Sequence, residues 1–133
     1  RTPDRDVLLA ELQFIHHNKT GRLITASAVL GGLLGGAADE TIEALRRYGL
    51  ALGLAFQIVD DLLDIEQSSE TLGKTAGKDV AQGKLTWPAL LGVEAARAEA
   101  ARLLGEALEN AGIIAGPVNS LGAIARYICE RRS

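Results

Sequence analysis

Apolar residues recur every three or four positions along most of the chain, which is the spacing of an amphipathic helix. Helical runs of this kind cover residues 7–15, 23–36, 41 to about 66, 90–108 and 121–129. No segment alternates apolar and polar residues as a half-buried strand would. The sequence therefore predicts an all-α protein, a bundle of about five helices that forms one domain over residues 1–133.

Capping and loop-forming residues predict where these helices begin and end. Asp39 is expected to cap the third helix and Thr86 the fourth, with Trp87 in the first turn of the latter. Residues 67–83 are rich in glycine and serine, and we predict a loop there. Ser120 is expected to cap the last helix.

The segment between the first two helices contains adjacent histidines and a glycine. His16 and His17 point to different faces of a helix, so they make a poor metal-binding pair. We expect a capping or solvent-exposed role for both. Gly21 weakens the helix that contains it. The sequence predicts a break at this glycine, which would leave Lys19 and Thr20 near backbone groups that face a cavity.

Three aspartates interrupt an otherwise apolar helical run. At about 100° per residue, Gln57, Asp60, Asp61 and Asp64 fall on one stripe that is roughly 100° wide. Like charges on one face repel unless a cation neutralises them. Mg²⁺ accepts one or two carboxylates and keeps positions for water and phosphate oxygens. The stripe indicates a site for Mg²⁺ and a phosphorylated substrate, and the alternative is a solvated acidic face.

Glycines and lysines near the stripe suit a phosphate site. Gly49 and Gly53 lie on or beside it, within two turns of the aspartates, and leave space for a ligand or a partner helix. Lys74, Lys78 and Lys84 lie in or next to the predicted loop that follows. A glycine-rich lysine loop could cover a metal-bound polyphosphate as a lid, although a plain solvent-exposed loop would have the same composition.

Composition narrows the class of protein. The 133 residues are 47% hydrophobic with a net charge of −3, which suits one globular domain with a core. This mild acidity gives no electrostatic case for nucleic acid, and no apolar stretch is long enough for a membrane span. Cys129 stands alone, which suits a reducing compartment, so we expect a cytoplasmic protein. The chain opens with Arg1 and has no methionine, so we interpret it as the C-terminal part of a longer protein.

Four motifs occur in a fixed order along the chain. They are K-T-G-x-L-I from Lys19, G-L-A-F-Q-x-x-D-D-x-x-D from Gly53, L-G-K-x-x-G-x-D from Leu72 and G-K-x-T-x-P-A-L from Gly83. In this order and spacing they resemble the C-terminal half of trans-isoprenyl diphosphate synthases, above all bacterial farnesyl and geranylgeranyl diphosphate synthases. The resemblance covers essentially the whole chain. It implies an isoprenoid-synthase-type helical fold and a prenyltransferase that condenses an allylic diphosphate with isopentenyl diphosphate.

The resemblance assigns chemical roles to the stripe. Asp60, Asp61 and Asp64 resemble the family's second aspartate-rich motif, which holds Mg²⁺ against the allylic diphosphate. Thr20 and Gln57 resemble the groups whose oxygens face the developing allylic cation. The metal and lysine ammonium groups would stabilise the leaving diphosphate. Neutral oxygens would stabilise the cation without trapping it.

The same resemblance assigns substrate-binding roles. The lysines that match the clamps on the allylic diphosphate are Lys19, Lys74 and Lys84. Phe56 resembles the aromatic side chain beside isopentenyl diphosphate, and the basic tail that reaches this substrate is matched by Arg131 and Arg132. The expected catalytic residues are then Lys19, Thr20, Gln57, Asp60 and Asp61. The family also implies a homodimer.

Other functions remain open. The family's first aspartate-rich motif has no counterpart in these 133 residues, so the chain alone is expected to be inactive. A subunit that only dimerises with an active partner is one alternative, but a pure scaffold needs no clustered aspartates. A terpene cyclase of the same fold is another, although the Lys19 and Lys84 segments fit chain elongation better. An iron-binding carboxylate bundle would need a Glu-x-x-His motif, which the sequence lacks.

Overall fold

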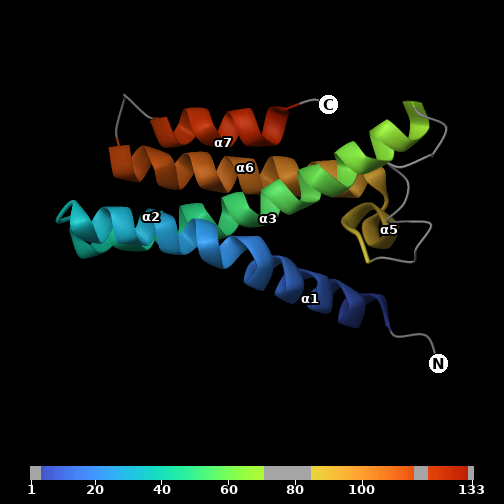
Figure 1. Ribbon diagram of the computed structural model, residues 1–133, viewed down its shortest axis with the longest axis horizontal. Helices are drawn as coiled ribbons and strands as arrows, with labels where there is room; N and C mark the ends of the chain where they lie inside the picture. Colours follow the sequence, from blue (N-terminus) through green and yellow to red (C-terminus); the bar gives the residue numbers. More distant parts are fainter. Residues whose placement is uncertain (1–3, 71–84, 116–119, 132–133) are drawn as a thin grey trace.

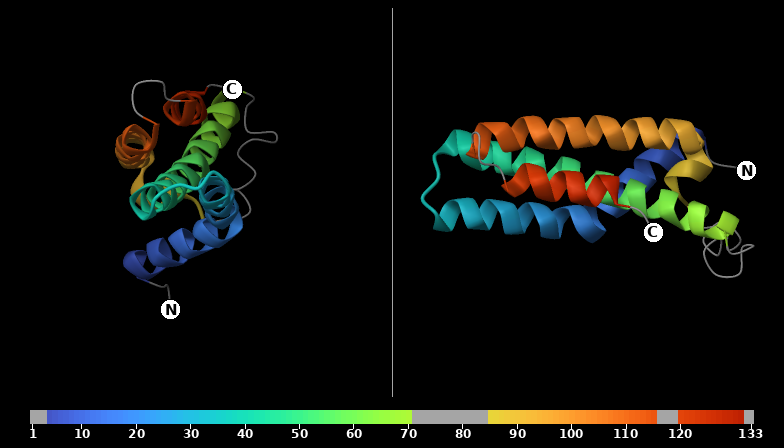
Figure 2. Two further views of the ribbon diagram at one scale, coloured as in Figure 1. Left: turned by 90° about the vertical axis from the view of Figure 1, so that its left-hand side faces the viewer. Right: turned by 90° about the horizontal axis from the view of Figure 1, so that it is seen from above.

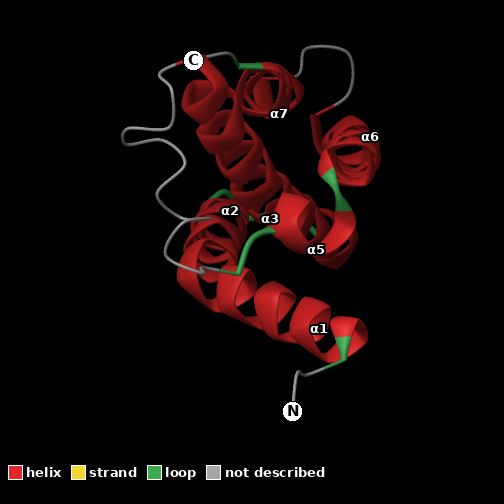
Figure 3. Ribbon diagram, turned by 90° about the vertical axis from the view of Figure 1, so that its right-hand side faces the viewer, coloured by secondary structure: helices red, strands yellow, loops and turns green. Residues whose placement is uncertain are grey.

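The computed structural model describes residues 4–70, 85–115 and 120–131, and every regular element among them is a helix (Figures 1 and 3). In chain order these are α1 (Arg5–His16), η1 (His17–Gly21), α2 (Arg22–Leu34), α3 (Asp39–Glu70), α5 (Trp87–Leu91), α6 (Val93–Ala115) and α7 (Ser120–Glu130). The predicted all-α class is confirmed. Within these ranges, no helix is both long and apolar enough to cross a membrane.

Helix α3 is the centre of the bundle. It contacts each of the other described helices, with α2 on one side and α6 on the other (Figures 1 and 2). Ala55 and Ile58 on α3 are fully buried, as are Ala96 and Ala107 on α6. Burying a side chain the size of Ile58 contributes about 1.5–3 kcal/mol, whereas exposed ion pairs contribute about 0–1 kcal/mol each. The apolar α3–α6 contact therefore holds the bundle, rather than the arginine–glutamate pairs on its surface.

The chain does not break between the first two predicted helices. The five residues of η1 form a π-helical turn that joins α1 to α2 without interruption. Gly21 has helical dihedral angles, φ −57° and ψ −41°, so the helix continues through this glycine. A π turn contains one residue more than an α turn, and the helix continues through it. The predicted break at Gly21 was therefore wrong.

The ends of α3 differ from the prediction, whereas the cap of α5 confirms it. The Ile42 N–H donates to the Ala38 carbonyl over 3.0 Å, so Asp39 is the first helical residue rather than the cap. The helix also continues to Glu70, beyond the predicted start of the loop. At the start of α5, the Thr86 side chain accepts a hydrogen bond from the Ala89 N–H over 3.3 Å, as predicted for an N-cap.

Gly92 divides the predicted helix over residues 90–108. Its φ of +88° lies in a region that L side chains rarely adopt. The Gly92 N–H closes α5 by donating to the Pro88 carbonyl over 2.8 Å, and the Gly92 carbonyl starts α6 by accepting from Ala96 over 3.0 Å. The result is a five-residue helix, α5, whose direction is independent of the long helix α6 (Figure 3).

Two glycines let α3 approach the rod formed by η1 and α2. A Cβ atom at Gly53 would lie 2.7 Å from the Cα atom of Gly21, and one at Gly49 would lie 2.6 Å from the Cα atom of Thr25. Neither position has room for a side chain. Of the two uses predicted for these glycines, the structure shows the partner helix.

A buried hydrogen bond joins α1 to α5. The Trp87 indole N–H donates to Nδ1 of His16 over 2.9 Å, and the two residues are 1% and 7% exposed. The neutral imidazole must therefore carry its proton on Nε2. Burial, with a smaller contribution from the charge of Lys19, lowers the pKa of His16, while Asp60 opposes the shift. The exposed role predicted for His16 was wrong, whereas His17 is exposed.

Replacing Gly53 with alanine should destabilise the protein by about 1–3 kcal/mol, because the new methyl group meets backbone that cannot move aside. The matched control is Gly105→Ala, since a Cβ atom there meets nothing within 4 Å. It should be neutral or stabilising by up to about 1 kcal/mol. Urea unfolding measures both, and a Gly53→Ala variant as stable as the wild type would contradict the close approach.

The depressed pKa of His16 makes stability depend on pH. The unfolded chain takes up this proton near pH 6.5, before the folded protein does. Stability should therefore fall as pH drops from about 6.5, with a slope of at most about 1.4 kcal/mol per pH unit. His16→Asn offers an acceptor that does not titrate and should flatten the slope, whereas His17→Asn should leave it unchanged. Urea midpoints between pH 5 and pH 7.5 test this, and equal slopes for all three proteins would refute it.

Candidate active site

Thr20 and Gln57 meet at the contact between η1 and α3. The Gln57 amide nitrogen Nε2 donates to Oγ1 of Thr20 over 2.6 Å. Gln57 is 7% exposed and Thr20 is half-buried. The two residues are 37 positions apart in the sequence, so the fold forms this pair. It gives one end of the aspartate stripe two polar groups that carry no net charge.

Asp60 faces the carboxyl end of the described chain. Its Oδ1 atom forms an ion pair with Arg131, whose Nε–H also donates to the Ile128 carbonyl over 3.0 Å. The guanidinium carbon lies 4.6 Å from the centre of the Phe56 ring, within the range of a cation–π interaction. Arg131 therefore contacts both Phe56, predicted to lie beside isopentenyl diphosphate, and Asp60, predicted to bind the metal.

Asp61 faces a different neighbour. Its Oδ2 atom accepts a hydrogen bond from the backbone N–H of Trp87 over 3.1 Å. Sequence reasoning missed both Trp87 and His16 as neighbours of the site. Two signals could have found them: the spacing of four from buried Leu12 puts His16 on the same helix face, and the first turn of a capped helix has N–H groups that need acceptors.

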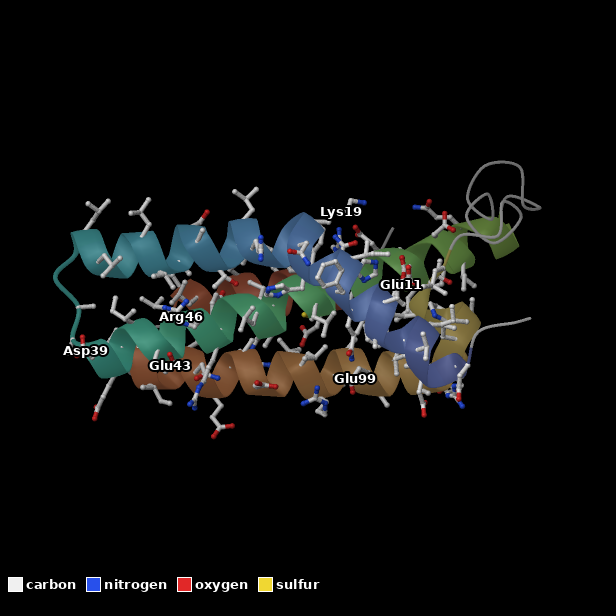
Figure 4. The ribbon with its side chains drawn as sticks, turned by 90° about the horizontal axis from the view of Figure 1, so that it is seen from below. Glu11, Lys19, Asp39, Glu43, Arg46 and Glu99 are labelled. Carbon is white, nitrogen blue, oxygen red and sulfur yellow. The ribbon has the colours of Figure 1, made fainter. Side chains whose placement is uncertain are left out.

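Of the lysines predicted near the phosphate site, the structure describes only Lys19. Figure 4 shows Lys19 on the outer side of the rod where α1 meets α2, and this residue is exposed. Lys74, Lys78 and Lys84 lie outside the described residues, as does Arg132. The lid predicted for the lysine loop falls on the same part of the chain.

A cavity of about 780 Å³ lies against another side of α3, between this helix, α6 and α7. Its lining includes Val59, Leu62 and Leu104, together with Cys129, whose thiol pKa is raised by burial. None of the three aspartates lines it. The aspartates are only half-buried, so the described part of the chain does not enclose them in a cavity as predicted.

The aspartates fit Mg²⁺ by the chemistry of their donor atoms. Among residues 4–70, 85–115 and 120–131, no group of three His, Cys, Asp or Glu side chains is arranged to hold a metal ion. Mg²⁺ does not need such a cage, because it is commonly bound through one or two carboxylates plus water and phosphate oxygens. Asp60 and Asp61 supply such hard oxygen atoms, each already oriented by a hydrogen-bond donor.

Comparison with known proteins places this geometry in a family. The polyprenyl synthetase family model matches residues 1–117. A geranylgeranyl pyrophosphate synthase 10 of Arabidopsis thaliana, described as mitochondrial, is 50% identical over 131 residues. The match covers 98% of this chain and 38% of that protein. The chloroplastic geranylgeranyl pyrophosphate synthase 12 of the same plant is 49% identical, over 96% of this chain and 36% of its own length.

A solved structure agrees with these sequence matches. The crystal structure of a "putative farnesyl-diphosphate synthase" from Marinomonas sp. MED121 superposes with a TM-score of 0.72 and 34% identity. It covers 91% of this chain and 40% of that one. The chain thus spans little more than a third of the curated relatives it matches. By sequence and by fold, it belongs to the polyprenyl synthetase family.

Proposed function

We propose that the chain forms the part of a prenyltransferase that binds and ionises an allylic diphosphate, whose prenyl group is then transferred to isopentenyl diphosphate. The observation that carries the proposal is the Thr20–Gln57 hydrogen bond, one helical turn from Asp60 and Asp61. Ionisation separates a diphosphate anion from a carbocation. A site for it needs charge stabilisation for the anion next to uncharged dipoles for the cation.

Mg²⁺ is the proposed cofactor, and Asp60, Asp61 and Asp64 are the residues that would hold it. When bound, the ion would supply positive charge to the leaving diphosphate. Lys19 lies on η1, the turn that also carries Thr20, and is proposed to add ammonium charge. Lys74 and Lys84 are proposed for the same role.

Thr20 and Gln57 are proposed to act on the cation. Burial and the shared hydrogen bond fix the orientation of the Gln57 amide, so its dipole needs no rearrangement when the cation forms. Neither side chain carries a negative charge that would capture the carbocation. The pair therefore stabilises the cation while leaving the alkene of isopentenyl diphosphate as the nucleophile.

Arg131 and Arg132 are proposed to bind isopentenyl diphosphate, with Phe56 beside its hydrocarbon part. Arginine suits this role because its planar guanidinium can donate two parallel hydrogen bonds to a phosphate. The ion pair between Arg131 and Asp60 neutralises this carboxylate. Asp60 is also one of the residues proposed to hold Mg²⁺, so Arg131 would be free to bind a diphosphate if this carboxylate bound the ion.

The chain is proposed to be one helical part of a longer synthase. Large apolar side chains are exposed along the rod of α1 and α2, including Phe14 at 68%, Leu23 at 71% and Leu34 at 82%. Many large apolar side chains exposed on one rod are typical of a surface that another protein segment covers. The remainder of the synthase is the proposed cover. Assembly of the whole enzyme as a homodimer and a cytoplasmic location remain predictions.

Asp60→Asn keeps the size of the side chain but removes its charge, and should weaken the Mg²⁺-dependent binding of inorganic diphosphate to the chain. In the complete synthase, turnover should fall by about 10²-fold or more. The matched control is Asp39→Asn, the same change at the first residue of α3 (Figure 4). It should leave both quantities unchanged. Titration calorimetry and steady-state turnover are the measurements, and near-normal values for Asp60→Asn would refute the site.

Thr20→Val and Gln57→Leu should each lower kcat of the complete synthase at least about tenfold. A tenfold loss corresponds to an activation free energy that is higher by about 1.4 kcal/mol. The KM for the allylic diphosphate should change little, because the lost interaction belongs to the transition state. The double variant should lose less than the sum of the two, since one hydrogen bond is shared. Thr20→Ser keeps the hydroxyl and serves as the control. Strictly additive losses would show that the two residues act independently.

A further inference from the structure

Trp87 connects the two sides of the candidate site. Its backbone N–H donates to Oδ2 of Asp61 on α3, over 3.1 Å. Its indole N–H donates to Nδ1 of His16, the last residue of α1, over 2.9 Å. His16 directly precedes η1, the turn that carries Lys19 and Thr20. One residue therefore joins the helix of the aspartates to the helix that leads into the polar turn.

The hydrogen bond to His16 anchors Trp87. Helix α5 contains only five residues and ends at Gly92 with a φ of +88°, and so short a helix has little stability of its own. The Thr86 side chain caps the Ala89 N–H, which leaves the Trp87 N–H directed to Asp61. The bond between the indole and His16 is almost fully buried, so water cannot replace it without exposing the core.

We propose that Trp87 is a positioning residue for the metal–diphosphate site, and that it orients the Asp61 carboxylate from its anchor on His16. The inference rests on the proposed function, because it concerns a carboxylate that would hold Mg²⁺. Asp60, in contrast, meets Arg131 near the carboxyl end of the described chain. Asp61 thus accepts a hydrogen bond from the backbone of a residue in the core of the bundle.

Orientation of a metal-binding carboxylate affects affinity. Hydrogen bonds from neighbouring groups hold such a ligand in the geometry that the metal needs, and losing one typically costs 10- to 100-fold in metal affinity. A role for Trp87 in core packing alone makes a different prediction. It would lower the stability of the protein without a selective loss of metal-dependent binding.

The test is titration calorimetry of the 133-residue chain with inorganic diphosphate at a fixed Mg²⁺ concentration. Trp87→Phe keeps an aromatic ring but removes the indole donor, and should weaken binding by about 10- to 100-fold. The matched control is Tyr48→Phe, which also removes one buried aromatic donor. That hydroxyl donates to the Leu121 carbonyl over 2.7 Å and joins α3 to α7. The control should bind diphosphate as the wild type does.

A second measurement needs no variant of Trp87. It is the only tryptophan in the chain, so the indole fluorescence of the wild type reports on this residue alone. Emission should change when Mg²⁺ and diphosphate are added together, and Asp61→Ala should abolish the change. Equal weakening in Trp87→Phe and Tyr48→Phe would overturn the proposal by showing a general loosening of the fold.

The remaining outcomes separate the two hypotheses. If the wild type binds diphosphate, Asp60→Asn weakens this binding, and Trp87→Phe stays within twofold of the wild type, the positioning role is overturned and the proposed function stands. Emission that stays constant while calorimetry detects binding has the same meaning. Absence of Mg²⁺-dependent binding by the wild-type chain would overturn both.

Discussion

The backbone contact between Gly21 and Gly53 is the constraint on which the candidate site depends. The two helices cross so closely that a Cβ atom at position 53 would lie 2.7 Å from the Cα atom of Gly21. Thr20 directly precedes one glycine, and Gln57 follows the other by one helical turn. The close crossing therefore sets the 2.6 Å hydrogen bond between these side chains. A wider crossing would separate donor from acceptor while leaving most of the apolar core in contact.

The π turn of η1 is what brings the right residues to this crossing. In an uninterrupted α-helix, the additional residue would rotate every later side chain by about 100°. The wider turn absorbs it instead, so Leu12 and His16 before the turn and Gly21 and Thr25 after it are all buried in the bundle. Such turns are often found at functional sites. Here the turn carries Lys19 and Thr20, two of the residues proposed to act on the substrate.

The sequence predicted the helices better than it predicted the connections between them. Periodicity identified the all-α class, and the spacing of Gln57 and the aspartates placed them on one stripe of α3. The π turn has no counterpart in a period of 3.6 residues, so a glycine that continues the helix was interpreted as a break. Gly92 was overlooked because a positive φ depends on the direction of the next helix. The hydrogen bonds of Trp87 join residues 26 and 71 positions apart, which no local pattern contains.

Asp60 and Asp61 are adjacent in the sequence, but their carboxylates have different partners. About 100° separates them around α3, so one faces a side chain near the carboxyl end of the chain and the other faces a backbone group in the core. The Arg131 side chain is 27% exposed, so its guanidinium is within reach of an anion from solvent. The Trp87 N–H is fixed by a buried indole. In the proposed function, Asp61 would therefore offer a metal a carboxylate held in a fixed orientation, whereas Asp60 would have to leave its ion pair with Arg131 to bind the ion.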